Sequence, residues 1–192
     1  MTNSLNQMRS PQVLIWIIMI VIYGFLELII GIRNRGHFRG NAARDPTFYT
    51  VTIPSMVGMY GAIVESLMKN HTFPPAWFGS GCAILACGII IRISALVQIG
   101  RGFSTGLVHT EGQWLQTTGF YGLIRHPLYS ATLLQVLGSG IMLHSWFSLA
   151  MLPVCLAGII LRIRKEERFM MDEFPEYKDY MKKTRRLIPW IY

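Results

Sequence analysis

The feature that most constrains this chain is a series of five apolar runs, because a helix needs about 20 apolar residues to cross the hydrocarbon core of a bilayer. The runs cover residues 11–32, 47–68, 77–99, 127–143 and 146–161. Only His144 and Ser145 separate the last two runs, which predicts a tight helical hairpin. With 52% hydrophobic and 15% charged residues, the chain is too apolar for a soluble domain. We therefore expect an all-α integral membrane protein with about five transmembrane helices.

The cationic residues predict how these helices are oriented, because short cytoplasmic loops collect Lys and Arg. With five spans, every Lys and Arg except Arg9, Lys69 and Arg92 falls on the side of the C-terminus. The N-terminus is therefore expected outside, with the polar loop 100–126, the C-terminus and any active site in the cytoplasm. The net charge of +8 is attributed to contact with anionic lipid and not with nucleic acid.

The chain leaves no room for a separate soluble domain, so residues 1–192 are expected to form a single membrane domain. Residues 162–183 mix charges with aromatic side chains and methionines, which predicts an amphipathic tail helix on the membrane interface or over a pocket. The three cysteines, Cys82, Cys87 and Cys155, lack the spacing of a metal site and are expected to be packing residues. No metal is predicted.

Arg125, His126 and Pro127 form the first candidate site. Proline suits the first position of a helix, which places Arg125 and His126 at the N-terminal mouth of the fourth span. A helix N-terminus offers unpaired N–H donors and partial positive charge, which would hold a carboxylate. The alternative is that Arg125 meets lipid phosphates while His126 only caps the helix.

Arg162, Glu166 and Glu167 form a second candidate group at the end of the fifth run. Arg162 and Glu166 are four residues apart and share a helix face, so a surface salt bridge is the simpler alternative. The tight hairpin, however, brings this group to the mouth of the fourth span. The sequence therefore predicts one pocket that holds two arginines, a histidine and two carboxylates.

Arg92 lies inside the third run, where a charge must be paired or must reach the surface. Snorkelling or a structural ion pair is favoured for Arg92 over a part in the pocket. Structural roles are also favoured for Glu27, Glu65 and His144.

The spacing of Gly119, Tyr121, Arg125-His126-Pro127 and Tyr129, followed by the hairpin and by Arg162-x-x-x-Glu166-Glu167, resembles the isoprenylcysteine carboxyl methyltransferase and phospholipid methyltransferase superfamily. The similarity covers residues 100–189, which would be the cofactor-binding half. It implies a membrane enzyme that transfers a methyl group from S-adenosylmethionine and releases S-adenosylhomocysteine. By motif position, Arg162 would face the methyl acceptor. The implied cofactor contacts are Gln113, Trp114, Leu115, Gln116, Tyr121, His126, Pro127, Leu128, Tyr129 and Glu166, with one more near Val108 or His109.

The residue types leave the methyl acceptor open, although a lipophilic or membrane-associated molecule is expected. A carboxylate, as in a prenylcysteine, has a pKa of roughly 3.5, so it is ionised at neutral pH and needs no base. This class is favoured, with Arg162, Glu167 and Tyr129 as the catalytic candidates. The amine of a phospholipid head group would have to lose a proton, and the candidate bases are His126, Tyr129 and Glu167. A small thiol falls between these two.

Two other classes of protein remain as alternatives. Sterol reductases are similar in their C-terminal spans and bind NADPH, but their chains are much longer than 192 residues. A non-catalytic membrane module would leave the convergence of charges unexplained. The sequence indicates no particular oligomeric state.

Overall fold

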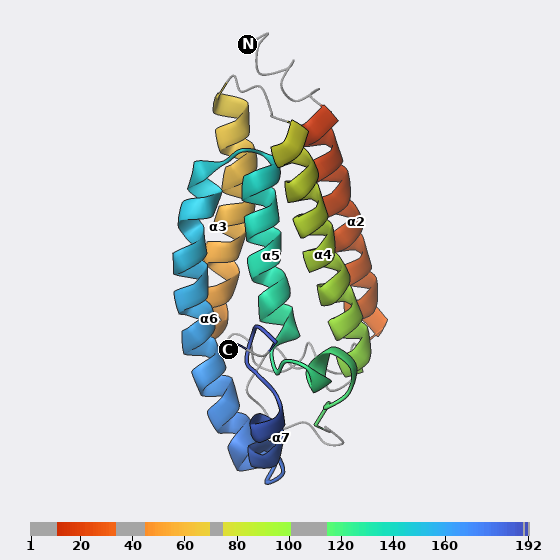
Figure 1. The fold of residues 1–192 in the computed structure, drawn as a ribbon, viewed down its shortest axis with the longest axis vertical. Coiled ribbons are helices and arrows are strands. Elements are labelled where there is room, and N and C mark those ends of the chain that lie inside the picture. The colour runs from red at the N-terminus through yellow and green to blue at the C-terminus, as the bar shows by residue number, and fades with distance from the viewer. Residues whose placement is uncertain (1–10, 34–44, 70–74, 101–114, 190, 192) are drawn as a thin grey trace.

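The structure, a computed structural model, describes residues 11–33, 45–69, 75–100, 115–189 and 191. Five long helices lie side by side in a bundle (Figure 1). They are α2 (Pro11–Arg33), α3 (Thr47–Met68), α4 (Pro75–Ile99), α5 (Pro127–Met142) and α6 (Trp146–Glu173). Each lies on one of the five predicted runs, which confirms the all-α membrane fold.

The five helices differ in their ability to span a bilayer. Helices α2, α3, α4 and α6 are long and apolar enough to do so. Helix α5 has 16 residues and covers about 24 Å, less than the roughly 30 Å of a hydrocarbon core. It lies in the centre of the bundle, packed against α4, α6 and α3 (Figure 1). The predicted fourth span is therefore a short central helix.

Glycines allow α4 and α5 to pack closely. A Cβ atom on Gly138 would lie 2.5 Å from the backbone nitrogen of Leu85, and one on Gly81 would lie 2.2 Å from that of Met142. Small residues permit this close backbone approach in many membrane proteins. Cys155 belongs to the core and Cys82 packs against it, as predicted, whereas Cys87 is exposed.

The predicted hairpin joins α5 to α6, and its short turn is stabilised by a side chain from α3. Ser145 caps α6 by accepting a hydrogen bond from the backbone N–H of Ser148 at 3.1 Å. Glu65 accepts a hydrogen bond from the Ser145 hydroxyl and another from the Phe147 N–H at 2.9 Å. Glu65 therefore has the structural role that the sequence favoured.

The tail differs from the prediction. Helix α6 does not end near residue 161 but continues to Glu173, so that it has 28 residues in all. The chain then turns at Pro175, and the short helix α7 (Tyr177–Lys183) follows. A single amphipathic helix over residues 162–183 is therefore wrong. The first part of that segment continues the fifth span, because Arg162 and Glu167 find partners inside the protein.

After α7, the chain returns to the beginning of α5 (Figure 1). The backbone N–H groups of Arg125 and His126 donate to the carbonyls of Arg185 and Arg186, at 2.7 and 3.0 Å. The Ser130 hydroxyl donates to the Leu187 carbonyl at 2.6 Å. We call residues 184–188 the return segment. It occupies N–H donors that the sequence suggested would hold a ligand carboxylate.

Candidate active site

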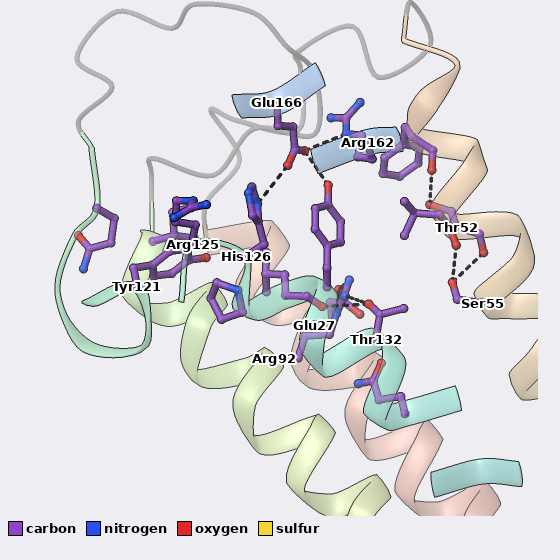
Figure 2. A pocket seen from close by; sticks show the side chains of 18 of the residues that line it. Glu27, Thr52, Ser55, Arg92, Tyr121, Arg125, His126, Thr132, Arg162 and Glu166 are labelled. Carbon is purple, nitrogen blue, oxygen red and sulfur yellow. Dashed lines mark hydrogen bonds and ion pairs between the residues drawn. The ribbon is translucent and has the colours of Figure 1, made fainter. Parts of the chain in front are cut away.

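A cavity of about 560 Å³ lies at the end of the bundle where α5 begins (Figure 2). Its polar end includes His126, Tyr129, Arg162 and Glu166. From there it extends between α2 and α3, where the lining is largely apolar and includes Ile20, Met56, Met59 and Tyr60. Helix α2 packs on α4 and helix α3 packs on α6. The two sides of the cavity are therefore formed by different pairs of helices. The cavity is therefore polar at one end and lipophilic at the other.

Glu166 is the centre of the polar end (Figure 2). Its Oε1 atom accepts hydrogen bonds from the Tyr129 hydroxyl at 2.6 Å and from Arg162 Nε at 2.8 Å. Its Oε2 atom lies 3.5 Å from His126 Nδ1. Helices α5 and α6 thus bring the two predicted groups together. The predicted pocket is confirmed for Arg125, His126, Arg162 and Glu166, which line the cavity, but not for Glu167.

Arg162 is almost completely buried, with 2% of its side chain exposed. Its Nη1 atom donates to Asp45 Oδ2 at 2.6 Å and to the Thr47 hydroxyl at 3.0 Å. Lys165 also donates to Asp45, at 2.8 Å. Burial alone would raise the pKa of Asp45, but the hydrogen bonds from Lys165 and Thr47 lower it to about 2. The guanidinium is therefore held at the cavity wall between the side chains of Asp45 and Glu166.

Glu167 has a different environment from Glu166. Its carboxylate accepts from Arg125 Nε at 2.8 Å and from Arg186 Nη2 at 2.8 Å, and its side chain is 4% exposed. It lies outside the set of described residues that line the cavity. The geometry therefore does not support the expectation that Glu167 acts on the acceptor. Glu167 instead ties the mouth of α5 to the return segment.

Two short elements complete the polar end. Gly119 opens the 3₁₀ turn η3 (Gly119–Gly122) with φ at +63°. A Cβ atom there would lie 2.5 Å from Oε1 of Gln98, which accepts a hydrogen bond from Phe120, so the motif requires glycine. Burial raises the pKa of Tyr180 of α7 to about 12, so its phenol stays protonated. It donates to the Tyr121 carbonyl at 2.6 Å.

Most of the predicted site residues face this one cavity. Those that line it are Leu115, Gln116, Tyr121, His126, Pro127, Leu128, Tyr129, Arg162 and Glu166. Gln113, Trp114, Val108 and His109 lie outside the described residues. No sequence signal pointed to Asp45. The tail was expected on the interface or over a pocket, and four of its side chains line the cavity: Phe169, Met170, Tyr177 and Tyr180.

Arg92 forms an ion pair inside the bundle. Its Nη2 and Nε atoms donate to Glu27 Oε1 at 2.8 and 3.1 Å, and its Nη1 donates to the Thr132 hydroxyl at 3.0 Å. This ion pair is one of the alternatives expected for Arg92, and it gives Glu27 a structural contact. Both residues also line the cavity, so the expected preference for a structural role over a part in the pocket is not confirmed.

Comparisons with known proteins agree with this geometry. The sequence model of the isoprenylcysteine carboxyl methyltransferase family matches residues 81–172. A probable protein-S-isoprenylcysteine O-methyltransferase of Oryza sativa subsp. indica is 30% identical over 80% of this chain and 85% of its own length. The chain belongs to the isoprenylcysteine carboxyl methyltransferase family. It is thus a methyltransferase and a multi-pass integral membrane protein.

The solved structure of a eukaryotic isoprenylcysteine carboxyl methyltransferase, described as an intramembrane Ras methyltransferase, has the same fold. Its TM-score is 0.58 at 24% identity, with 73% of this chain covered. The chain spans about half the length of that solved protein, 53%. Another relative is named a cobalt-zinc-cadmium resistance protein, from Cupriavidus metallidurans. It is 29% identical over 69% of this chain and 63% of its own length.

Proposed function

We propose that this protein transfers a methyl group from S-adenosylmethionine to the carboxylate of a lipophilic, prenylcysteine-type acceptor. The observation that supports this most directly is the form of the cavity. A polar end holding Arg162 and Glu166 continues into an apolar passage between α2 and α3. A molecule with an anionic head and a lipid tail has the same distribution of polar and apolar groups.

The polar end has incompletely paired groups that suit S-adenosylmethionine. Among the described residues, the buried Tyr121 hydroxyl has no hydrogen-bond partner, and the buried His126 Nε2 makes no hydrogen bond but lies 3.5 Å from Glu167 Oε1. Buried polar atoms are rarely left in this state, so a bound ligand with polar groups would satisfy them. Glu166 would meet ammonium or hydroxyl groups of the cofactor, and the rings of Tyr121 and Tyr177 would contact its base. When bound, the cofactor supplies a methyl group already activated on a sulfonium.

The side chains around the acceptor position favour a carboxylate over an amine. Of the three candidate bases, Tyr129 is engaged with Glu166 through its hydroxyl and Glu167 is held by two arginines, so only His126 remains at the cavity to accept a proton. A carboxylate needs no proton removed, since its reference pKa is roughly 3.5. Arg162 would orient this anion, and the buried surroundings would exclude water from it.

The first experiment identifies the cofactor and the acceptor. The melting temperature of the purified protein should rise when S-adenosylhomocysteine is added and should not change when NADPH is added. Methyl transfer is then measured with S-farnesylcysteine, phosphatidylethanolamine and a small thiol as acceptors. We expect transfer to the carboxylate of S-farnesylcysteine only. Transfer only to the amine or to the thiol would contradict the proposal, and the metal-resistance relative makes that comparison necessary.

Arg162→Lys tests the position of the acceptor. The guanidinium already donates through Nε to Glu166 and through Nη1 to Asp45 and Thr47, so an acceptor carboxylate would share it with these groups, and lysine cannot reproduce this planar fork. We expect kcat/KM for S-farnesylcysteine to fall at least about tenfold, while the affinity for S-adenosylhomocysteine stays within about threefold. Arg164→Lys, on the exposed side of the same helix, is the matched control. Normal transfer by Arg162→Lys would make Arg162 only a structural anchor.

A further inference from the structure

A polar cluster lines the cavity well inside the bundle, beyond the groups assigned to methyl transfer. It contains the Arg92–Glu27 ion pair and Thr132, which Figure 2 shows together. Tyr23 of α2 lies beside Glu27 and Gln135. Ionised and amide groups at this depth in a membrane protein are costly, and they commonly mark sites of function.

Gln135 is the member of this cluster whose side chain is incompletely paired. It is 2% exposed and lines the cavity, and its Nε2 atom, beside the Tyr23 phenol, makes no hydrogen bond of normal geometry among the described residues. A buried amide without partners is destabilising, and a methionine of similar volume would fill the same space without that cost. The amide group is therefore suited to a ligand that brings a polar atom to this point.

The position of Gln135 relates this point to the reacting end of the cavity. Gln135 follows Tyr129 by six residues on α5, which corresponds to about 9 Å along the helix axis. Apolar side chains from the two outer helices, among them Ile20, Met56 and Met59, line other parts of the same cavity. A lipid chain running through the cavity would thus meet this polar cluster, and the Thr52 and Ser55 side chains of α3, among apolar side chains.

We propose that Gln135, beside the Arg92–Glu27 pair, forms a polar subsite that binds an uncharged oxygen, such as a keto group, within the lipophilic chain of the methyl acceptor. This inference rests on the proposed function, because it assumes that the acceptor's carboxylate lies near Arg162. Tyr23 and Glu27 come from α2, which precedes the residues matched by the family model. An acceptor chain that carries such an oxygen should therefore bind more tightly than a plain hydrocarbon chain.

Two positional isomers test the subsite by binding alone. Both are S-alkylcysteines of equal length with one keto group, placed about 9 Å from the carboxylate in the first and about one helical turn further in the second. Their equal composition equalises partition into detergent. With S-adenosylhomocysteine present, the full-length protein should bind the first isomer about tenfold more tightly, as expected for one buried hydrogen bond. Equal affinities, or no binding of either isomer, would overturn the subsite.

Gln135→Met should reduce this preference to within about twofold, because the methionine keeps the volume and removes the amide. Leu137→Met, half-buried on the same helix, is the matched control and should retain the preference. An unchanged preference in Gln135→Met would also overturn the subsite. The comparison of isomers in the parent protein decides the matter if that variant does not fold. If the isomers bind selectively but neither is methylated, the subsite stands and the proposed reaction fails.

Discussion

Glu166 is shared by three side chains, and this sharing determines what its replacement would do. One carboxylate oxygen accepts from both Tyr129 and Arg162, and the other faces His126. An amide oxygen can still accept hydrogen bonds, but without the negative charge it cannot pair with Arg162 or with a cationic ligand. The residue therefore combines a structural contact with a proposed contact to the cofactor.

We expect Glu166→Gln to weaken binding of S-adenosylhomocysteine at least about tenfold, or about 1.4 kcal/mol. Isothermal titration of the detergent-solubilised variant measures this. Asp172→Asn, on the exposed side of the same helix, should bind as the parent does. Unchanged binding by Glu166→Gln would support the simpler interpretation of Glu166 as a salt-bridge residue.

Asp45 fastens the segment before α3 to α6, so its loss should destabilise the bundle. We expect Asp45→Asn to lower the free energy of unfolding by about 1–3 kcal/mol, since it weakens the pairing of a buried guanidinium. The folded pKa of about 2 lies below the unfolded value of about 3.9. The contribution is therefore present above pH 4 and lost as the pH falls toward 2. Melting curves of parent and variant should converge over that interval, and a constant difference would argue against the charge.

These residues also show what the sequence could and could not predict at this scale. The group formed by Arg125, His126, Arg162 and Glu166 could be predicted, because a two-residue turn leaves little freedom in how two helices align. Asp45 could not be predicted, since it lies between two helices and no periodicity relates it to α6. Glu166 and Glu167 point in directions about 100° apart around the helix axis. Their spacing in the sequence does not show which of them faces the cavity.

At the scale of the elements, the packing of α5 against α4 depends on close backbone contact. A Cβ atom on Gly138 would meet the backbone of Leu85 at 2.5 Å, whereas one on Gly79 would meet nothing within 4 Å. We expect Gly138→Ala to destabilise the protein by about 1–3 kcal/mol, the usual cost of overpacking. Gly79→Ala is the control. Chemical unfolding in mixed micelles measures both, and equal stabilities would mean that α4 and α5 can separate without cost.

Helix positions were predictable from apolar length, whereas the end of α6 was not. Charged residues after Leu161 suggested that the membrane helix stops there, because charges usually mark the edge of a span. In the structure these charges pair with groups from the segments just before α3 and α5 and from the return segment, so the helix continues. Contacts that are distant in sequence thus determined a boundary that local composition placed too early.

For the whole molecule, the arrangement of charges predicts a topology that labelling can test. The cavity end of the bundle is expected in the cytoplasm, and the turn after α3 is expected outside. In a background without native cysteines, Met68→Cys should react with an impermeant reagent from outside intact cells. Lys178→Cys should react only after permeabilisation. Both positions are exposed. Labelling of both from the same side would overturn the five-span arrangement.

The position of the return segment could not be predicted from any part of the sequence. Its short sequence has no strand-like alternation, and its pairing with Arg125 and His126 joins positions about 60 residues apart. A contact between residues so far apart in the sequence forms only when the rest of the fold brings the two segments together.

The passage between α2 and α3 has an energetic consequence for a lipid acceptor. Moving a hydrocarbon chain from the bilayer into water costs about 0.8 kcal/mol per methylene group, so a chain of 15 carbons would require on the order of 10 kcal/mol. A cavity that receives the chain at the depth of the bilayer avoids most of this desorption energy. Encounter between enzyme and acceptor then becomes a matter of lateral diffusion, and its rate depends on the surface density of acceptor in the membrane and not on its solubility in water.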